Sequence, residues 1–179
     1  MTNEHRLRCY DYVNQPDAKV RAALRSDAAG IFARATTSAT ERERSIGVQL
    51  HVRVGPLDVA TDVRVEIGPP EEKMSSPVGY PMTIFPLSWS AVKSPSLFPR
   101  MRGSLSVYPL SSSETQLEFE GIYDPPLGLL GDAIDAMAGH RIAEASVLQF
   151  LRDVAALLRN ELANQTAAPD TSPLTAAKR

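Results

Sequence analysis

The sequence has one cysteine, no long apolar run and no excess of charge of either sign. Because Cys9 has no second cysteine to pair with, an internal disulfide is excluded and a reducing compartment is favoured. Charge, glycine or proline interrupts every apolar stretch before the roughly 20 residues that a membrane-spanning helix needs, and the charged N-terminus does not fit a secretory signal. The net charge of -2 indicates no nucleic-acid partner. We therefore expect a cytoplasmic protein without a transmembrane segment.

Motifs with a dedicated chemistry are missing as well. The sequence contains no phosphate-binding glycine loop, no G-x-S-x-G elbow and no dinucleotide fingerprint. Its three histidines, His5, His51 and His140, fall on separate predicted elements, without metal-ligand spacing to another His, Cys or acid. We therefore expect no metal and no other cofactor, and the sequence leaves open whether the protein catalyses a reaction.

What the sequence does contain is a series of strand patterns. With 179 residues, 43% of them apolar, the chain is long enough for one domain with a hydrophobic core. Several segments alternate apolar and polar residues with the period of a half-buried strand. They are Arg6–Val13, Gly47–Val54, Leu57–Ile67, Tyr80–Val92, Arg100–Tyr108 and Glu114–Tyr123. Short turns between successive strands predict an antiparallel meander with one solvated face.

Prolines affect one part of this predicted sheet. The segment Pro69–Gly79 carries no strand pattern, and we expect a loop there. Pro81 and Pro86 fall inside the next strand, and proline has no N–H to donate to a neighbouring strand. This strand is therefore expected at an edge of the sheet, or with a bulge or break near Pro86.

Helical patterns flank the strands. Between the first and second strands, Ala18–Leu24 and Ala28–Thr36 predict two short helices, and Ser26-Asp27 supplies an N-cap for the second. After the last strand, apolar residues recur every three or four positions as far as Leu162, which predicts one long helix. Its buried stripe is Val147, Phe150, Leu151, Val154, Ala155, Leu158 and Leu162. We expect a single domain over residues 1–162 and a disordered tail over 163–179.

Polar residues enter this stripe in the first half of the long helix. Here His140, Arg141 and Glu144 follow Gly139. In one interpretation His140 and Glu144 form a solvated i,i+4 pair, which stabilises a helix by about 0.2–0.5 kcal/mol. In the other, the three side chains line the polar end of a pocket between helix and sheet. Both interpretations stay open at the level of the sequence.

The order of these elements resembles a known superfamily. A strand, two short helices, an antiparallel meander and a long C-terminal helix, with the closing segment YDPPLGLLGDAIDAMAGHRIAEASVLQFLRDVAALL, is similar to the START-like, or SRPBCC, superfamily. It includes lipid-transfer START domains, plant pathogenesis-related allergens and polyketide cyclases or aromatases. The resemblance covers about Leu7 to Leu162. It implies an α+β helix-grip fold: a curved antiparallel sheet with two short helices, and a long C-terminal helix across it that encloses a hydrophobic cavity.

The resemblance also implies a ligand. We expect a small hydrophobic molecule, lipid-like or polyketide-like, in this cavity. Its candidate apolar contacts are Leu50, Val63, Phe85, Trp89, Leu105 and Phe119, and its candidate polar contacts are Tyr123, His140, Arg141 and Glu144. Inward aromatic residues such as Trp89 are also what a plain core requires. The alternatives are a polyketide cyclase or aromatase-like enzyme, and an interaction module with a filled core. The protein is expected to be a monomer or a homodimer.

Overall fold

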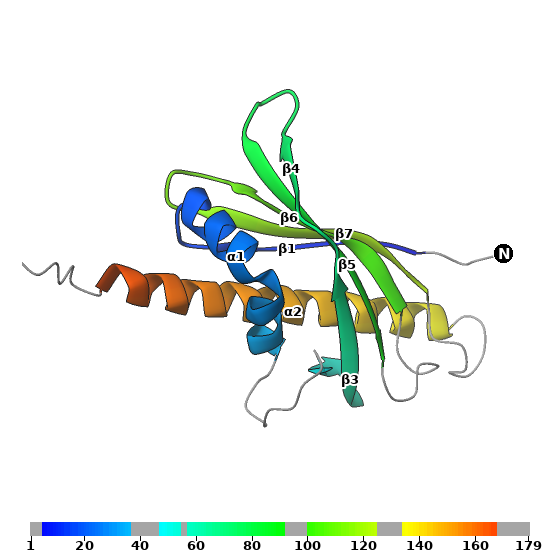
Figure 1. The fold of residues 1–179 in the computed structure, drawn as a ribbon. Coiled ribbons are helices and arrows are strands. Elements are labelled where there is room, and N and C mark those ends of the chain that lie inside the picture. The colour runs from blue at the N-terminus through cyan, green and yellow to red at the C-terminus, as the bar shows by residue number, and fades with distance from the viewer. Residues whose placement is uncertain (1–4, 37–46, 55–56, 92–99, 125–133, 168–179) are drawn as a thin grey trace, which may run out of the picture.

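A computed structural model describes residues 5–36, 47–54, 57–91, 100–124 and 134–167 (Figure 1). In chain order the elements are β1 (His5–Val13), α1 (Asp17–Thr36), β2 (Gly47–Val54), β3 (Leu57–Ile67), β4 (Glu71–Met74), β5 (Pro81–Ala91), β6 (Arg100–Pro109), β7 (Thr115–Asp124) and α2 (Ile134–Ala167). The helix α2 continues past Leu162, so the first residues of the predicted tail, up to Ala167, are helical.

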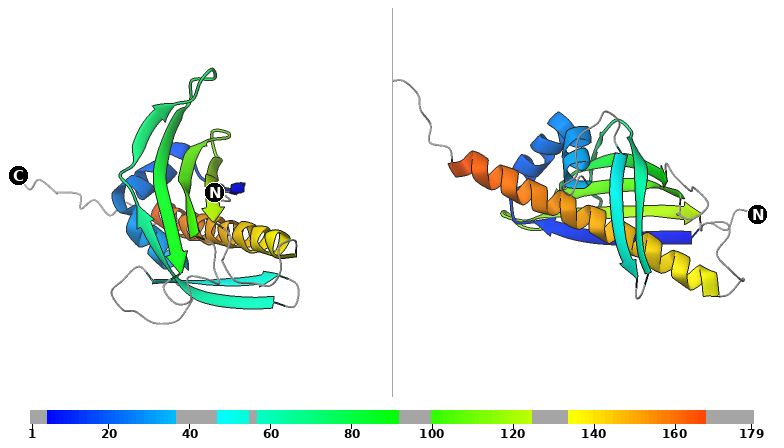
Figure 2. Two further views of the ribbon diagram at one scale, coloured as in Figure 1. Left: turned by 90° about the vertical axis from the view of Figure 1, so that its right-hand side faces the viewer. Right: turned by 90° about the horizontal axis from the view of Figure 1, so that it is seen from below.

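The strands form one seven-stranded antiparallel sheet in the order β1-β7-β6-β5-β3-β2, and β4 pairs with β5 beside this path. The first strand therefore lies next to the last one. The sheet twists and curves around α2, which contacts the edge strands β1 and β2 (Figure 2). This is the α+β helix-grip architecture that the sequence predicted.

The two short helices are also confirmed as two helical segments of α1. They meet at Asp27, whose backbone is not helical (φ -154°, ψ 58°). The Asp27 carboxylate accepts a hydrogen bond from the Gly30 N–H at 2.9 Å, as an N-cap residue does. This bond and the Arg34 guanidinium lower the pKa of Asp27. The N-cap predicted at Ser26-Asp27 therefore lies at Asp27.

The segment after β3 departs from the expectation. Glu71–Met74, predicted to lie in a loop, forms β4 and pairs with Pro81–Ile84 of β5. Farther along β5, residues Leu87–Ala91 pair with β3 instead. The loop prediction was wrong because this strand gains its hydrogen bonds from β5 and has all four side chains exposed, so it carries no apolar alternation.

Pro86 lies in β5 where the partner strand changes from β3 to β4. Its carbonyl accepts a hydrogen bond from the Gly68 N–H at 2.8 Å. In an antiparallel strand, the backbone N and O atoms of one residue point to the same side of the strand. The backbone position at which Pro86 lacks an N–H therefore faces the gap between β3 and β4. The predicted break therefore affects the pairing on one side of β5 only, because β6 pairs with β5 through Pro86 on the other side.

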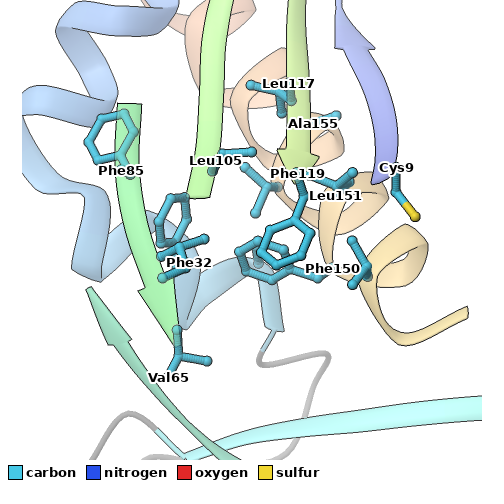
Figure 3. Packing of buried hydrophobic residues seen from close by; sticks show 14 of the residues in the cluster. Cys9, Phe32, Val65, Phe85, Leu105, Leu117, Phe119, Phe150, Leu151 and Ala155 are labelled. Carbon is cyan, nitrogen blue, oxygen red and sulfur yellow. The ribbon is translucent and has the colours of Figure 1, made fainter. Parts of the chain in front are cut away.

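The core lies between α2, α1 and the inner face of the sheet (Figure 3). All seven residues of the predicted stripe on α2 are buried, from Val147 to Leu162. Phe32 of α1 packs edge-on against Phe150 of α2 and Phe85 of β5, with ring centroids 5.4 and 6.3 Å apart. Three elements that are distant in sequence thus share one aromatic contact.

A pair of glycines shapes the middle of the inner face. Gly103 of β6 lies directly opposite Gly121 of β7, and the ring of Phe119 lies close to both. A Cβ atom added at Gly103 would be 2.4 Å from the Glu120 carbonyl oxygen and 2.7 Å from the Phe119 ring. Neither distance is compatible with a side chain, so glycine is required for this close approach.

We expect Gly103→Ala to lower the free energy of unfolding by about 1–3 kcal/mol, because the methyl group overpacks the inner face. Urea unfolding followed by circular dichroism measures this difference. The control is Ser104→Ala, one residue along on the outer face, where a change within about 0.5 kcal/mol is expected. Equal stability of the two variants would contradict this packing.

Candidate functional site

One cross-strand row on the inner face contains three rings that carry polar atoms, those of His5, Tyr123 and Trp89. The register pairs His5 with Tyr123, Tyr123 with Met101, and Met101 with Trp89. Side chains at paired positions share a face of the sheet. Tyr123, Met101 and Trp89 are buried, and His5 is partly buried. The row therefore crosses the inner face from β1 to β5.

Tyr123 lies between two histidines. The His5 ring stacks on it, with centroids 5.2 Å apart and an interplanar angle of 22°. From α2, the Nδ1 atom of His140 lies 3.1 Å from the Tyr123 hydroxyl, within hydrogen-bond distance. Burial raises the pKa of the Tyr123 phenol, so this group keeps its proton at neutral pH. The three side chains form a cluster at one end of the row, joined by one ring stack and one contact at hydrogen-bond distance.

Trp89 occupies the other end of the row. Only 2% of its surface is exposed, and its ring packs against Phe119 and Phe150 with centroids 5.3 and 5.7 Å away. Within the described part of the chain, the indole Nε1 has no hydrogen-bond partner. A buried donor without a partner costs about 1–3 kcal/mol. An N–H in this position is therefore suited to an acceptor that is not part of the described chain.

On the outer face of the sheet, the buried polar group of Glu118 has several hydrogen-bond partners. Glu118 is 7% exposed, and its carboxylate accepts hydrogen bonds from Arg8 Nε at 2.6 Å, from Gln116 Nε2 at 3.0 Å and from the Tyr108 hydroxyl. Among the described residues, the buried side-chain atoms without a partner are His5 Nε2, Asp17 Oδ1 and Trp89 Nε1. The other carboxylate oxygen of Asp17 binds Arg21. Two of the three atoms therefore belong to the inner row.

The predicted site residues separate into three groups. Phe85, Trp89, Leu105 and Phe119 are buried on the inner face, and Tyr123 and His140 are brought together. Leu50 and Val63 belong to β2 and β3, but their side chains lie outside the described residues. Arg141 and Glu144 are exposed. His140 is exposed as well, and we keep it in the site and omit Arg141 and Glu144 because its Nδ1 lies 3.1 Å from the Tyr123 hydroxyl.

Sequence reasoning missed His5. It is separated from Tyr123 by more than a hundred residues, and only the register of β1 against β7 places the two rings together. The alternation of β1 does contain a signal, since His5 has the same parity as the inward residues Leu7 and Cys9. His140 also has a partner outside its own helix, because its Nδ1 atom lies within hydrogen-bond distance of the Tyr123 hydroxyl on β7.

No described helix has the length and apolar character needed to cross a membrane. Within the described ranges, no three His, Cys, Asp or Glu side chains gather as a metal site would require. The arrangement offers hydrogen bonds and apolar contacts to a ligand, and it offers the paired hydroxyl and imidazole of Tyr123 and His140 for proton exchange.

An antiparallel sheet that grips one long C-terminal helix defines the START-like, or SRPBCC, fold, and this chain has that fold. It is similar to a conserved protein from Geobacillus kaustophilus, with a TM-score of 0.54 and 11% identity over 88% of this chain and 97% of that chain. The chain is also similar to an aromatase/cyclase from Streptomyces, with a TM-score of 0.45 and 12% identity over 93% of this chain and 98% of that one. No protein-family model and no curated protein matches the sequence.

Cys9 lies on the inner face of β1, where it is 4% exposed. Burial, with a smaller contribution from Glu144, raises the pKa of its thiol from 9.0 to about 11. The thiolate, which is the reactive form, is therefore about 100-fold less abundant at pH 8 than for an ordinary cysteine.

We expect iodoacetamide at pH 8 to label Cys9 at least about 100-fold more slowly in the native protein than in urea. The measurement is simple, because Cys9 is the only cysteine in the chain. Mass spectrometry of the intact protein gives both rates. Labelling of the native protein at the rate of the unfolded chain would contradict the buried position.

Proposed function

We propose that this protein binds a small, mostly apolar molecule between the inner face of the sheet and α2. The observation that carries the proposal is the unpartnered indole N–H of Trp89, buried among Phe119 and Phe150. A bound molecule with an oxygen acceptor would complete this hydrogen bond, while its apolar part would contact the neighbouring rings. A cytoplasmic location and a monomeric or homodimeric state remain predictions from the sequence.

The alternative of a plain core explains this part of the molecule less well. Buried polar groups in folded proteins almost always have partners, and Glu118 shows how fully this chain partners such a group on the outer face. An indole serves an apolar core well only where its N–H reaches an acceptor. The N–H of Trp89 therefore supports a ligand more than it supports a closed interior.

A second candidate is acid–base chemistry on such a ligand, as in a polyketide cyclase-like enzyme. It is favoured by the 3.1 Å approach of the Tyr123 hydroxyl to His140 Nδ1. Since burial keeps the phenol protonated, Tyr123 would donate a proton or hydrogen bond to a ligand carbonyl, and the imidazole would accept a proton.

If this second function holds, the protein will accelerate the exchange of α-hydrogens of a ketone probe such as 2-tridecanone with D₂O. Tyr123→Phe should then remove at least about nine-tenths of the acceleration, in line with the usual size of general acid–base catalysis. Proton NMR of the probe measures the exchange. No acceleration by the wild-type protein would dismiss the candidate and leave ligand binding unaffected.

The binding function is tested directly by Trp89, the only tryptophan in the chain. We expect its emission to change saturably, at a stoichiometry of one to one, when the protein is titrated with dodecanoic acid or with 2-naphthol. Trp89→Phe keeps an apolar ring but lacks the N–H, and calorimetry should show about threefold to tenfold weaker binding of 2-naphthol, whose oxygen can accept from the indole, to this variant.

The matched control is Tyr10→Phe, which changes an exposed ring on the outer face of β1 and should leave the affinity unchanged. Native mass spectrometry of the freshly purified protein adds a second readout, since a co-purifying molecule would identify the ligand. An absence of saturable binding of both probes would overturn the proposed function.

A further inference from the structure

Two nitrogen atoms without partners lie on the same cross-strand row of the inner face. They are His5 Nε2 on β1 and Trp89 Nε1 on β5, both buried and both without a hydrogen-bond partner among the described residues. Tyr123 and Met101 occupy the two positions between them. The row thus has a polar atom in need of a partner near each end.

The spacing of the row gives the approximate size of a molecule that could reach both atoms. From β1 to β5 there are three steps between adjacent strands, and at about 4.8 Å a step the two backbones are roughly 14 Å apart. Met101, which is fully buried, offers an apolar side chain in between. A molecule lying along the row would therefore be elongated and apolar in its middle.

The chemistry of the two atoms differs. The indole Nε1–H only donates, so its partner is an oxygen acceptor such as a hydroxyl, ketone or ether. The imidazole of His5 can donate a hydrogen bond from Nε2, which suits a carboxylate. Tyr123 holds the His5 ring by stacking, and His140 engages the Tyr123 hydroxyl from α2. The His5 nitrogen is thus left for a group that the described chain does not provide.

We propose that the ligand carries oxygen at two points, as in a medium-chain hydroxy acid or oxo acid, with the carboxylate at His5 and the second oxygen at Trp89. This inference rests on the proposed binding function and deepens it. A ligand with a single polar end would satisfy one nitrogen and leave the other buried without a partner. Oxygen at both points satisfies both.

The test compares two probes of equal chain length, dodecanoic acid and ω-hydroxydodecanoic acid, by isothermal titration calorimetry on the full chain. Placing a hydroxyl in an apolar site without a partner weakens binding. If Trp89 provides the partner, the hydroxy acid should instead bind about threefold to tenfold more tightly than dodecanoic acid. The predicted sign is therefore the opposite of what a purely apolar site would give.

Single substitutions test which residue contacts each end of the ligand. Trp89→Phe should abolish the preference for the hydroxy acid while dodecanoic acid still binds. His5→Phe, which keeps a ring to stack on Tyr123, should weaken both acids to a similar extent and leave the preference intact. Tyr10→Phe, on the outer face of β1, should change neither value. Circular dichroism spectra and urea midpoints are compared to confirm that each variant folds.

The outcomes separate the two proposals. Tighter binding of dodecanoic acid than of the hydroxy acid to the wild-type protein would overturn the two-point ligand and leave the binding function standing. A preference for the hydroxy acid that persists in Trp89→Phe would overturn the assignment of the second oxygen to Trp89. Binding of neither acid, together with no saturable effect of 2-naphthol on the emission of Trp89, would overturn the binding function itself.

Discussion

The burial of one face of α2 against the curved sheet is the constraint on which the structure depends. The helix contacts both edge strands, β1 and β2, so it completes the enclosure of the inner face that the sheet begins. Its apolar stripe meets α1 and the sheet through Phe150, which packs against Phe32 and Trp89. Each completely buried side chain of this size contributes about 1.5–3 kcal/mol. Without α2, the inner face would be an exposed apolar surface.

The same enclosure makes the unpartnered nitrogen atoms of the inner row informative about a ligand. If the nitrogen atoms of His5 and Trp89 were exposed, they would form hydrogen bonds with water, and their lack of a protein partner would not indicate a ligand. Under α2 and between the strands they are shielded from solvent. A buried hydrogen-bonding atom without a partner destabilises the folded state, and folded proteins rarely retain one. Tyr123 and His140 show the opposite case, because the helix brings a partner to the buried hydroxyl. Burial thus turns ordinary side chains into a candidate recognition site.

Much of the fold could be predicted from local patterns. The alternation of Leu57–Ile67 and Arg100–Tyr108, the stripe from Val147 to Leu162, and the N-cap at Asp27 each depend on neighbours a few residues away. The strand β4 could not be predicted in the same way, because all its side chains are exposed and only its hydrogen bonds to β5 make it a strand. Likewise, β5 accommodates Pro86 because its partner strand changes from β3 to β4 near this residue, and no local sequence pattern predicts that change.

The sequence by itself determined which residues face inward along each strand and helix, because side-chain direction follows from the period of the backbone. It therefore identified Phe85, Trp89, Leu105 and Phe119 as inner-face residues. Only the tertiary structure decided which of these side chains meet. The pairing of β1 with β7 placed His5 on Tyr123, and the docking of α2 brought His140, which is exposed like Arg141 and Glu144, within hydrogen-bond distance of the Tyr123 hydroxyl. The register of β1 against β7 joins residues more than a hundred positions apart, and the docking of α2 joins a helix to a separate strand. Such contacts depend on the whole packed molecule rather than on any one segment.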